Sequence, residues 1–185
     1  NQTIRENAAL FDRLGGEVVV VGLDSPDREV GPAVLDEYAA ALAAFADGVD
    51  LTVCVEFNWG ATVRSLRAAA EIARRADHPR VRTLFDPAHY HCTPTKFAEL
   101  TAENVATLAH VHIDDMPALP GELTAVNDDR VLPGEGHLDL DALFGRIEDG
   151  GYEGYFSIEM FDDDLRALPE DEAARRLYDS MAKLL

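Results

Sequence analysis

The sequence predicts an α/β fold, a (β/α)8 or TIM barrel, of which this chain holds roughly the last five βα units. Two observations predict it. Short apolar runs with strand character alternate with helical patterns along the chain, which is typical of a parallel sheet covered by helices. Most of these runs also begin 28 to 34 residues apart. That interval is close to the roughly 31 residues per unit of a barrel of about 250 residues.

Five apolar runs have the length and composition of buried strands. The interval before the last of them is longer, 45 residues, because a long loop over residues 115–137 intervenes. The predicted strands are EVVVVGL (17–23), LTVCVEF (51–57), VRTLFD (81–86), AHVHIDD (109–115) and GYFSIEM (154–160).

The segments around these runs carry apolar residues at helical spacing. One of these helices opens at Asp139 and closes at Gly150, which are ordinary start and stop signals. The predicted helices are TIRENAALFDRL (3–14), one with Leu35, Tyr38, Leu42 and Phe45 on its apolar face, one with Leu140, Leu143, Phe144 and Ile147, and a last one after Pro169 with Leu177, Met181 and Leu184.

The chain is predicted to be a single domain, residues 1–185, that forms the C-terminal part of a barrel. Five barrel strands leave two open edges, which a folded protein has to cover. We therefore expect about three βα units on the N-terminal side, so that these strands are the fourth to the eighth. An intact open α/β sheet is the alternative.

The composition indicates a soluble globular domain, with 47% hydrophobic and 28% charged residues. We expect no membrane association, because no apolar stretch approaches the roughly 20 residues of a membrane helix. No signal-peptide pattern is present, and a cytoplasmic location is expected. Cys54 and Cys92 do not form a CxxC pair, so we expect two free, buried or half-buried thiols rather than a zinc finger or a disulfide framework.

The charge balance excludes one class of partner. A net charge of −19 repels a phosphate backbone, so we expect no binding to nucleic acid. The chain contains 20 Asp and 14 Arg but only two Lys residues. An Asp-rich, Lys-poor surface keeps a protein soluble in concentrated salt, and we hypothesise a salt-adapted source. A genome rich in G and C is the alternative explanation.

Polar side chains that can bind a metal lie near the ends of four successive predicted strands. They are Glu56, Asp86, His112 and Glu159. Active sites of such barrels lie at the carboxyl ends of the strands, where these side chains would meet. Converging carboxylates raise one another's pKa unless a positive charge lies between them. The pattern therefore predicts one divalent metal ion, and oxygen and imidazole ligands without thiolate suit Mn²⁺, Co²⁺, Mg²⁺ or Zn²⁺.

Three further histidines lie near these strand ends. Residues 110 and 112 point to the same side of a strand, so His110 is expected one layer deeper, hydrogen-bonded in the interior. His89 follows Asp86 by three residues and is better placed to face a substrate. His91 is expected to support its loop.

Five segments of the sequence are similar to motifs of a known protein family. The chain resembles the xylose-isomerase-like TIM barrel family of sugar and sugar-phosphate isomerases and epimerases, over essentially all residues from 17 onward. Within that family the segments are most similar to those of members that act on inososes. The segments are Glu56, DPAH (86–89), HVHIDD (110–115), DRVLPGEGHLDLDAL (129–143) and GYEGYFSIEMF (151–161).

The resemblance implies roles for six residues. The implied metal ligands are Glu56, Asp86, His112 and Glu159. In epimerase members the two glutamates also act as catalytic acid and base, and the implied substrate contacts here are His89 and Arg130. For Arg130 the alternative is a salt bridge with Asp128 or Asp129 that fixes the loop.

The implied function is a metal-dependent isomerase that moves a ketone along a cyclic polyol or sugar, by proton transfer through a metal-bound enediolate. A keto-sugar epimerase or an inosose dehydratase is the alternative within the family. An abasic-site endonuclease and a non-catalytic sugar-binding module are alternatives from other classes, and the net charge counts against the first. The expected partner is a small sugar or inosose, and the sequence is compatible with a homo-oligomer.

The salt hypothesis yields a direct prediction. Dialysis from molar salt into low salt should remove helical circular dichroism, because charge screening falls as the Debye length grows from about 3 Å at 1 M to about 30 Å at 0.01 M. A spectrum that does not change with salt would favour the genome-composition explanation instead.

Overall fold

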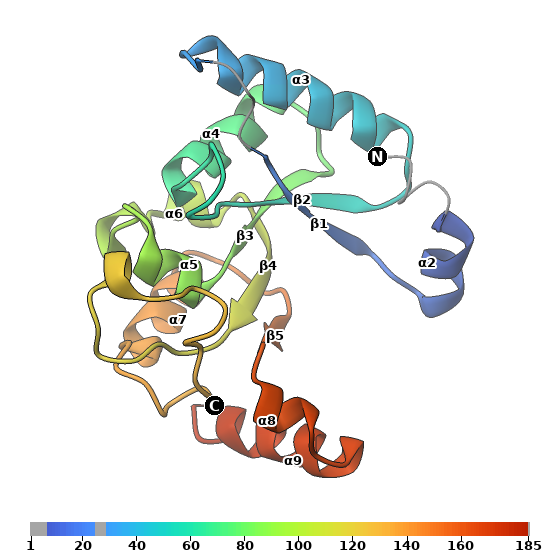
Figure 1. Ribbon diagram of the computed structural model, residues 1–185. Helices are drawn as coiled ribbons and strands as arrows, with labels where there is room; N and C mark the ends of the chain where they lie inside the picture. Colours follow the sequence, from blue (N-terminus) through green and yellow to red (C-terminus); the bar gives the residue numbers. More distant parts are fainter. Residues whose placement is uncertain (1–6, 25–28, 185) are drawn as a thin grey trace.

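The computed structural model describes residues 7–24 and 29–184. Its centre is a five-stranded parallel sheet with the strand order β1-β2-β3-β4-β5, so each strand pairs with the next one along the chain (Figure 1). The strands are β1 (Val18–Gly22), β2 (Thr52–Glu56), β3 (Val81–Phe85), β4 (Leu108–Ile113) and β5 (Phe156–Ile158). All five predicted strands are present, within the predicted segments or one residue beyond them.

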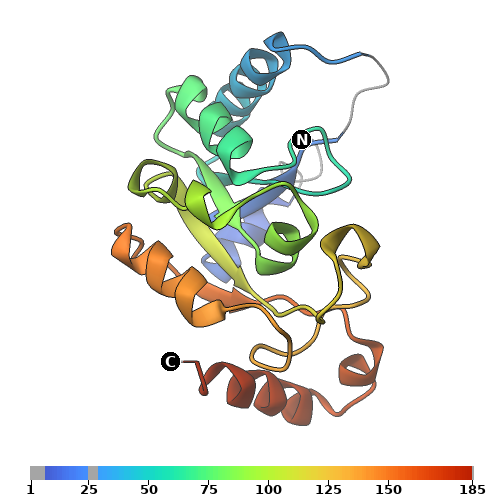
Figure 2. The same ribbon diagram turned by 90° about the vertical axis from the view of Figure 1, so that its left-hand side faces the viewer.

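Helices connect the strands, and α4, α6 and α7 lie on one side of the sheet (Figure 1). Figure 2 looks onto this helix-covered side, with α8 and α9 below the sheet. The helices are α2 (Ala8–Leu14), α3 (Ala33–Asp47), α4 (Leu66–Ala76), α5 (Pro87–Cys92), α6 (Ala102–Val105), α7 (Leu140–Asp149), α8 (Asp163–Arg166) and α9 (Glu170–Met181), with 3-10 turns η1 (Phe97–Glu99) and η2 (Gly121–Leu123).

The predicted helix boundaries can be compared with these elements. The helix expected over residues 3–14 is present as α2, and its first four residues lie outside the described part of the chain. The start signal at Asp139 is confirmed, because its carboxylate accepts the N–H of Ala142 at 3.1 Å and caps α7. The same helix ends at Gly150, and Gly151 then takes a positive φ of 91°.

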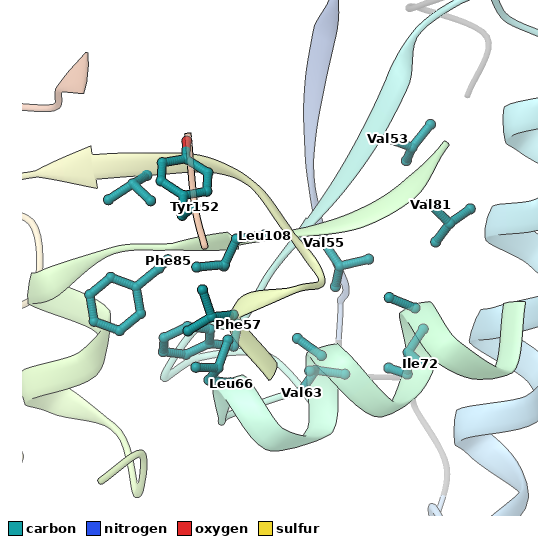
Figure 3. Packing of buried hydrophobic residues seen from close by; sticks show 14 of the residues in the cluster. Val53, Val55, Phe57, Val63, Leu66, Ile72, Val81, Phe85, Leu108 and Tyr152 are labelled. Atoms are coloured by element: carbon teal, nitrogen blue, oxygen red, sulfur yellow. The ribbon is translucent and has the colours of Figure 1, made fainter. Parts of the chain in front are cut away.

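The main hydrophobic core lies between the sheet and the helices. Successive side chains of a strand point to opposite faces, and one set faces the helices. From β2 this set includes Val53 and Val55, which are fully buried with Leu66 and Ile72 of α4 (Figure 3). Phe57 continues the core beyond the end of β2, and its ring lies 6.1 Å from that of Phe85. This core fixes the strands relative to one another.

The other face of the sheet carries a different set of side chains. Strand register aligns Cys54 with Arg82, Leu84 with His110, and His112 with Ser157. Because parallel strands end at the same edge, the side chains at their carboxyl ends lie side by side there. The register therefore gathers the polar strand ends in one place.

The two cysteines are free thiols, as the sequence predicted. Cys54 is buried, and burial raises its pKa to about 12, while Cys92 is half-buried. No helix in the described part of the chain is long and apolar enough to cross a membrane.

The core makes a stability prediction. Ile72 is fully buried, so Ile72→Ala should lower the free energy of unfolding by about 2–5 kcal/mol through lost burial and a residual cavity. Urea unfolding measures the change, with the slope m unchanged. Tyr178 of α9 is 71% exposed, and Tyr178→Ala should stay within about 0.5 kcal/mol. Equal losses in the two variants would contradict this assignment of the core.

Candidate metal centre

Four side chains from four adjacent strands meet at the carboxyl ends of the sheet. Glu56 is the last residue of β2, Asp86 follows β3, His112 lies on β4 and Glu159 follows β5. Each offers one ligand atom, and these atoms all lie within 4.8 Å of one another. The structure therefore brings together the four residues that the sequence singled out.

Asp86 has a separate task for each carboxylate oxygen. Its Oδ1 accepts the backbone N–H of His89 at 2.8 Å and caps α5, whose first residue is Pro87. Its Oδ2 lies 3.2 Å from His112 Nδ1 and accepts a hydrogen bond from Arg130 Nη1 at 3.1 Å. The helix cap thus leaves one oxygen of a fully buried carboxylate facing the other ligands.

His112 presents one nitrogen to three acids. Its Nδ1 lies 3.2 Å from Asp86 Oδ2, 3.3 Å from Glu159 Oε2 and 3.7 Å from Glu56 Oε1. A single N–H cannot form good hydrogen bonds to three carboxylates at once. A divalent cation can accept oxygen and imidazole ligands together, so this donor set fits a metal ion better than it fits a proton.

The close approach of charged groups shifts the pKa values of Glu56 and His112. Burial, followed by the charges of Asp86 and Glu159, raises the pKa of Glu56 to about 7, and His112 and Arg130 only partly offset this rise. Burial would lower the pKa of His112, but hydrogen bonds to Asp86 and Glu159 raise it to about 10. A cation among the carboxylates would favour the ionised form of Glu56 for the same electrostatic reason.

Arg130 is a buried cation that contacts the acids of this cluster. Its Nη1 donates to Asp86 Oδ2, to Asp114 Oδ2 and to the backbone carbonyl of Glu159, and it lies 3.0 Å from Glu159 Oε2. Its Nε donates to the carbonyl of Val126 at 3.1 Å. Arg130 therefore lies beside the candidate metal ligands, where its side chain holds the acids in place, and its contact with a substrate stays a prediction.

The alternative expected for Arg130 was a loop-fixing salt bridge with Asp128 or Asp129. The ion pairs of Arg130 in the described residues are instead with the buried acids and Glu159, and its one hydrogen bond to the loop is to the backbone carbonyl of Val126. Asp129 accepts the backbone N–H of Ala125 at 2.8 Å, and Asp128 is exposed. The loop acids are therefore not the partners of this guanidinium, because its side chain turns inward to a stronger concentration of negative charge.

Sequence reasoning gave no role to the two aspartates that end the HIDD segment. Asp114 is fully buried beside Arg130. Asp115 lies 1% exposed and holds the following loop. The sequence did contain an indication of their roles: two consecutive acids directly follow a buried strand, and buried acids require hydrogen-bond or ion-pair partners.

Asp115 organises the loop over residues 115–138 through backbone N–H groups. Its Oδ1 accepts from Met116 at 2.8 Å and from Leu138 at 3.1 Å, and its Oδ2 accepts from Gly134 at 3.2 Å and from Gly136 at 3.0 Å. A Cβ at Gly136 would collide with Asp115 Oδ1, so this close approach requires glycine.

His89 lies inside the site and is 2% exposed. Its Nε2 lies 3.8 Å from Glu56 Oε2 and 3.3 Å from Asn58 Nδ2. Burial is the main cause that lowers the pKa of His89, so the neutral ring is favoured. Sequence reasoning did not identify Asn58, because nothing in the sequence pairs residue 58 with residue 89.

The other two histidines each have a hydrogen-bond partner. The ring of His110 lies 5.4 Å from that of His112, and His110 Nε2 is 2.7 Å from Ser157 Oγ. The predicted hydrogen bond of His110 is therefore confirmed, but the residue is half-buried and not in the interior. His91 Nε2 lies 3.4 Å from Thr124 Oγ1, which links α5 to the following loop.

The parallel strands with helices outside, and the acids and imidazole at their carboxyl ends, define the class: a barrel-type α/β protein with a candidate divalent metal centre. A family model described as Xylose isomerase-like TIM barrel matches residues 2–184. The chain belongs to this family, and its five parallel strands are part of the (β/α)8 barrel.

Curated relatives are similar over part of their own length. The inosose isomerase of Halalkalibacterium halodurans is 26% identical over 147 residues, which cover 78% of this chain and 51% of that protein. The 3-dehydroshikimate dehydratase of Pseudomonas aeruginosa is 29% identical over 166 residues, or 86% of this chain and 26% of that protein. The chain thus spans about half the length of the inosose isomerases that it matches.

Solved structures share the fold. The IOLI protein, described with a binding zinc atom, has a TM-score of 0.87 at 22% identity, over 99% of this chain and 68% of that one. The 3-keto-D-glucoside 4-epimerase YcjR from E. coli has a TM-score of 0.68 at 22% identity, over 99% of this chain and 69% of that one. At these identities the likeness establishes the fold.

The contacts of Asp115 lead to a prediction about the loop. Asp115→Asn keeps one acceptor oxygen and replaces the other with a donor, so hydrogen bonds from Gly134 and Gly136, or from Met116 and Leu138, are lost. We expect a loss of stability of about 1–3 kcal/mol and faster amide hydrogen exchange at these residues. The exposed Asp128→Asn is the matched control, and unchanged exchange in Asp115→Asn would contradict the role.

Proposed function

We propose that this chain carries the active site of a metal-dependent isomerase that moves a ketone along a cyclic polyol or sugar. The observation that supports the proposal is the meeting of four ligand atoms within 4.8 Å at the carboxyl ends of the strands. Family membership and the similarity to inosose isomerases support the same substrate class. The pocket wall, the exact sugar and the whole protein's activity are part of this proposal, because the matched part of the chain spans only about half the length of the inosose isomerases.

In this proposal four atoms would hold one divalent ion, Zn²⁺, Mn²⁺, Co²⁺ or Mg²⁺. They are Glu56 Oε1, Asp86 Oδ2, His112 Nδ1 and Glu159 Oε2. When bound, the ion supplies Lewis-acid stabilisation of the negative charge that develops on substrate oxygens. The neighbouring protein groups, above all Arg130, keep the ligand carboxylates ionised and oriented.

Proton transfer is assigned to the glutamates. A proton on a hydroxyl-bearing carbon beside a ketone is weakly acidic, and its removal leaves an enediolate. Without a metal ion, burial raises the pKa of Glu56 to about 7, whereas the pKa values of Asp86 and Glu159 are lowered; a bound cation would favour the ionised form of Glu56, which a general base requires. Return of the proton by Glu56 to the former carbonyl carbon, together with transfer of the hydroxyl proton to the former carbonyl oxygen, moves the ketone to the neighbouring carbon. Delivery of a proton by Glu159 to the original carbon from the opposite face, while Glu56 keeps the proton it removed, would be epimerisation.

Substrate contacts are assigned to His89 and Arg130. His89 Nε2 lies 3.8 Å from Glu56, close to the position of the transferred proton. Arg130 has five N–H donors, and its hydrogen bonds within the described residues engage Nε and Nη1. Its remaining donors give it the capacity to hold a substrate oxygen beside Glu159.

A dehydratase is the second candidate function. The similarity to 3-dehydroshikimate dehydratase of Pseudomonas aeruginosa and to inosose dehydratase of Erwinia tasmaniensis favours it. Both reactions begin with removal of a proton beside a ketone, and the dehydratase then expels a neighbouring hydroxyl as water. The chemistry assigned to Glu56 is therefore common to both.

The two other classes are less well supported. An abasic-site endonuclease has to approach a phosphate backbone, which a net charge of −19 opposes. A non-catalytic sugar-binding module has no need of four potential metal ligands whose atoms lie within 4.8 Å of one another.

Deuterium incorporation tests the proposed reaction. The metal-loaded protein should introduce deuterium from D₂O into an inosose or ketohexose at the carbon beside the ketone, as read by NMR. Glu56→Gln should slow this exchange by about 10²–10⁴, because it removes the base. Loss of water with formation of an unsaturated ketone would identify the dehydratase. Ligand binding without exchange would favour the sugar-binding module.

Metal titration tests the ligand set without any substrate. Wild-type protein should bind one Zn²⁺ or Mn²⁺ per chain in calorimetry, and Asp86→Asn should weaken binding by at least about 100-fold. Glu135→Gln is the matched control, because Glu135 is an exposed acid outside the cluster. Equal affinities in all three proteins, with circular dichroism unchanged, would contradict the proposed centre.

A further inference from the structure

The loop that follows β2 carries an asparagine whose amide orientation is fixed by its own backbone. Asn58 Oδ1 accepts the N–H of Gly60 at 2.9 Å, and the Asn58 carbonyl accepts the N–H of Ala61 at 3.2 Å. The N–H of Asn58 donates to the carbonyl of Val63 at 2.9 Å. The amide oxygen is therefore committed to the loop, and the amide NH2 group faces the other way.

The NH2 group of Asn58 faces the ring of His89. Its Nδ2 lies 3.3 Å from His89 Nε2. An amide NH2 is a donor only, so Nε2 has to be the acceptor, and a proton on Nε2 would set donor against donor. Turning the amide over does not resolve this, because it would set the NH2 against the N–H of Gly60. A neutral imidazole carries one proton, and in this geometry it is on Nδ1.

We propose that Asn58 is a positioning residue that holds His89 in the Nδ1–H tautomer and so keeps Nε2 as a hydrogen-bond acceptor facing the site. Nε2 is the ring nitrogen near the proposed metal ligands, 3.8 Å from Glu56 Oε2. Nε2 has one lone pair, so a substrate hydroxyl would donate to it in place of the Asn58 NH2, and a substrate carbonyl oxygen would find no donor there. This consequence rests on the proposed function, and it specifies a polyol hydroxyl at His89.

The other ring nitrogen does not decide between the tautomers. His89 Nδ1 is buried and has no hydrogen-bond partner among the residues that the structure describes. Either tautomer leaves Nδ1 unpaired, as a donor or as an acceptor. Glu56 Oε2 is too far from Nε2 for a hydrogen bond. The preference therefore comes from the contact with Asn58.

Nitrogen-15 NMR of histidine-labelled protein, without metal or substrate, tests this inference. His89→Gln identifies the His89 signals. Wild-type protein should show His89 protonated on Nδ1. Asn58→Asp keeps an acceptor for Gly60 and presents an acceptor oxygen to Nε2, so the population ratio should shift by roughly tenfold toward Nε2–H. A wild-type ring protonated on Nε2, or a ratio unchanged by Asn58→Asp, would overturn the proposal.

Gly60→Ala is the matched control for disturbance of the loop. A Cβ there would lie 3.6 Å from Asn58 Oδ1, an ordinary contact, so the Asn58–His89 contact and the tautomer should be unchanged. A shift in Gly60→Ala as large as that in Asn58→Asp would overturn the proposal, because loop disturbance would then suffice to move the proton.

Kinetics supply a second readout on the holoenzyme. Asn58→Asp and His89→Gln should each lower kcat/KM by about tenfold or more, and the double variant should lose no more than His89→Gln alone, because both act through one ring. Additive losses would overturn the positioning role. The NMR result needs no turnover, so absence of isomerase activity in the wild type would count against the proposed function and not against the tautomer.

Discussion

The carboxylates of three candidate metal ligands meet one guanidinium at short range, and the electrostatic balance among them governs the arrangement of the site. Asp86 is fully buried and Glu56 nearly so, which in isolation would favour their protonated forms. Arg130 and His112 supply the opposing charge. One imidazole nitrogen cannot form hydrogen bonds to three acids at once. A divalent cation therefore neutralises the charge of the three carboxylates better than a proton does.

The fold supplies the precision that such a cluster needs. Parallel pairing brings Glu56, His112 and Glu159 to one edge of the sheet, and the helix-facing core holds the strands in register. The cap of α5 fixes Asp86 through one oxygen and leaves the other for the site. The same bond therefore begins a helix and orients a proposed ligand.

Loops complete the site through backbone hydrogen bonds. Asp115 gathers four N–H groups and so holds the segment that carries Arg130. Asn58 is held by its own turn and faces His89. In both cases a short polar side chain fixes the position of a residue that is distant in the sequence. The sheet and its loops therefore both position the groups of the proposed site.

The sequence by itself determined the five strands, the parallel α/β class and the four candidate ligands. Apolar patterning is local, and the carboxyl ends of parallel strands must meet, so Glu56 and Asp86 could be paired in advance. Only the tertiary structure decided that Arg130 turns to the buried acids rather than to Asp128, and that Asn58 contacts His89. These choices depend on how distant loops pack and where charge is compensated, and neither is encoded in local periodicity.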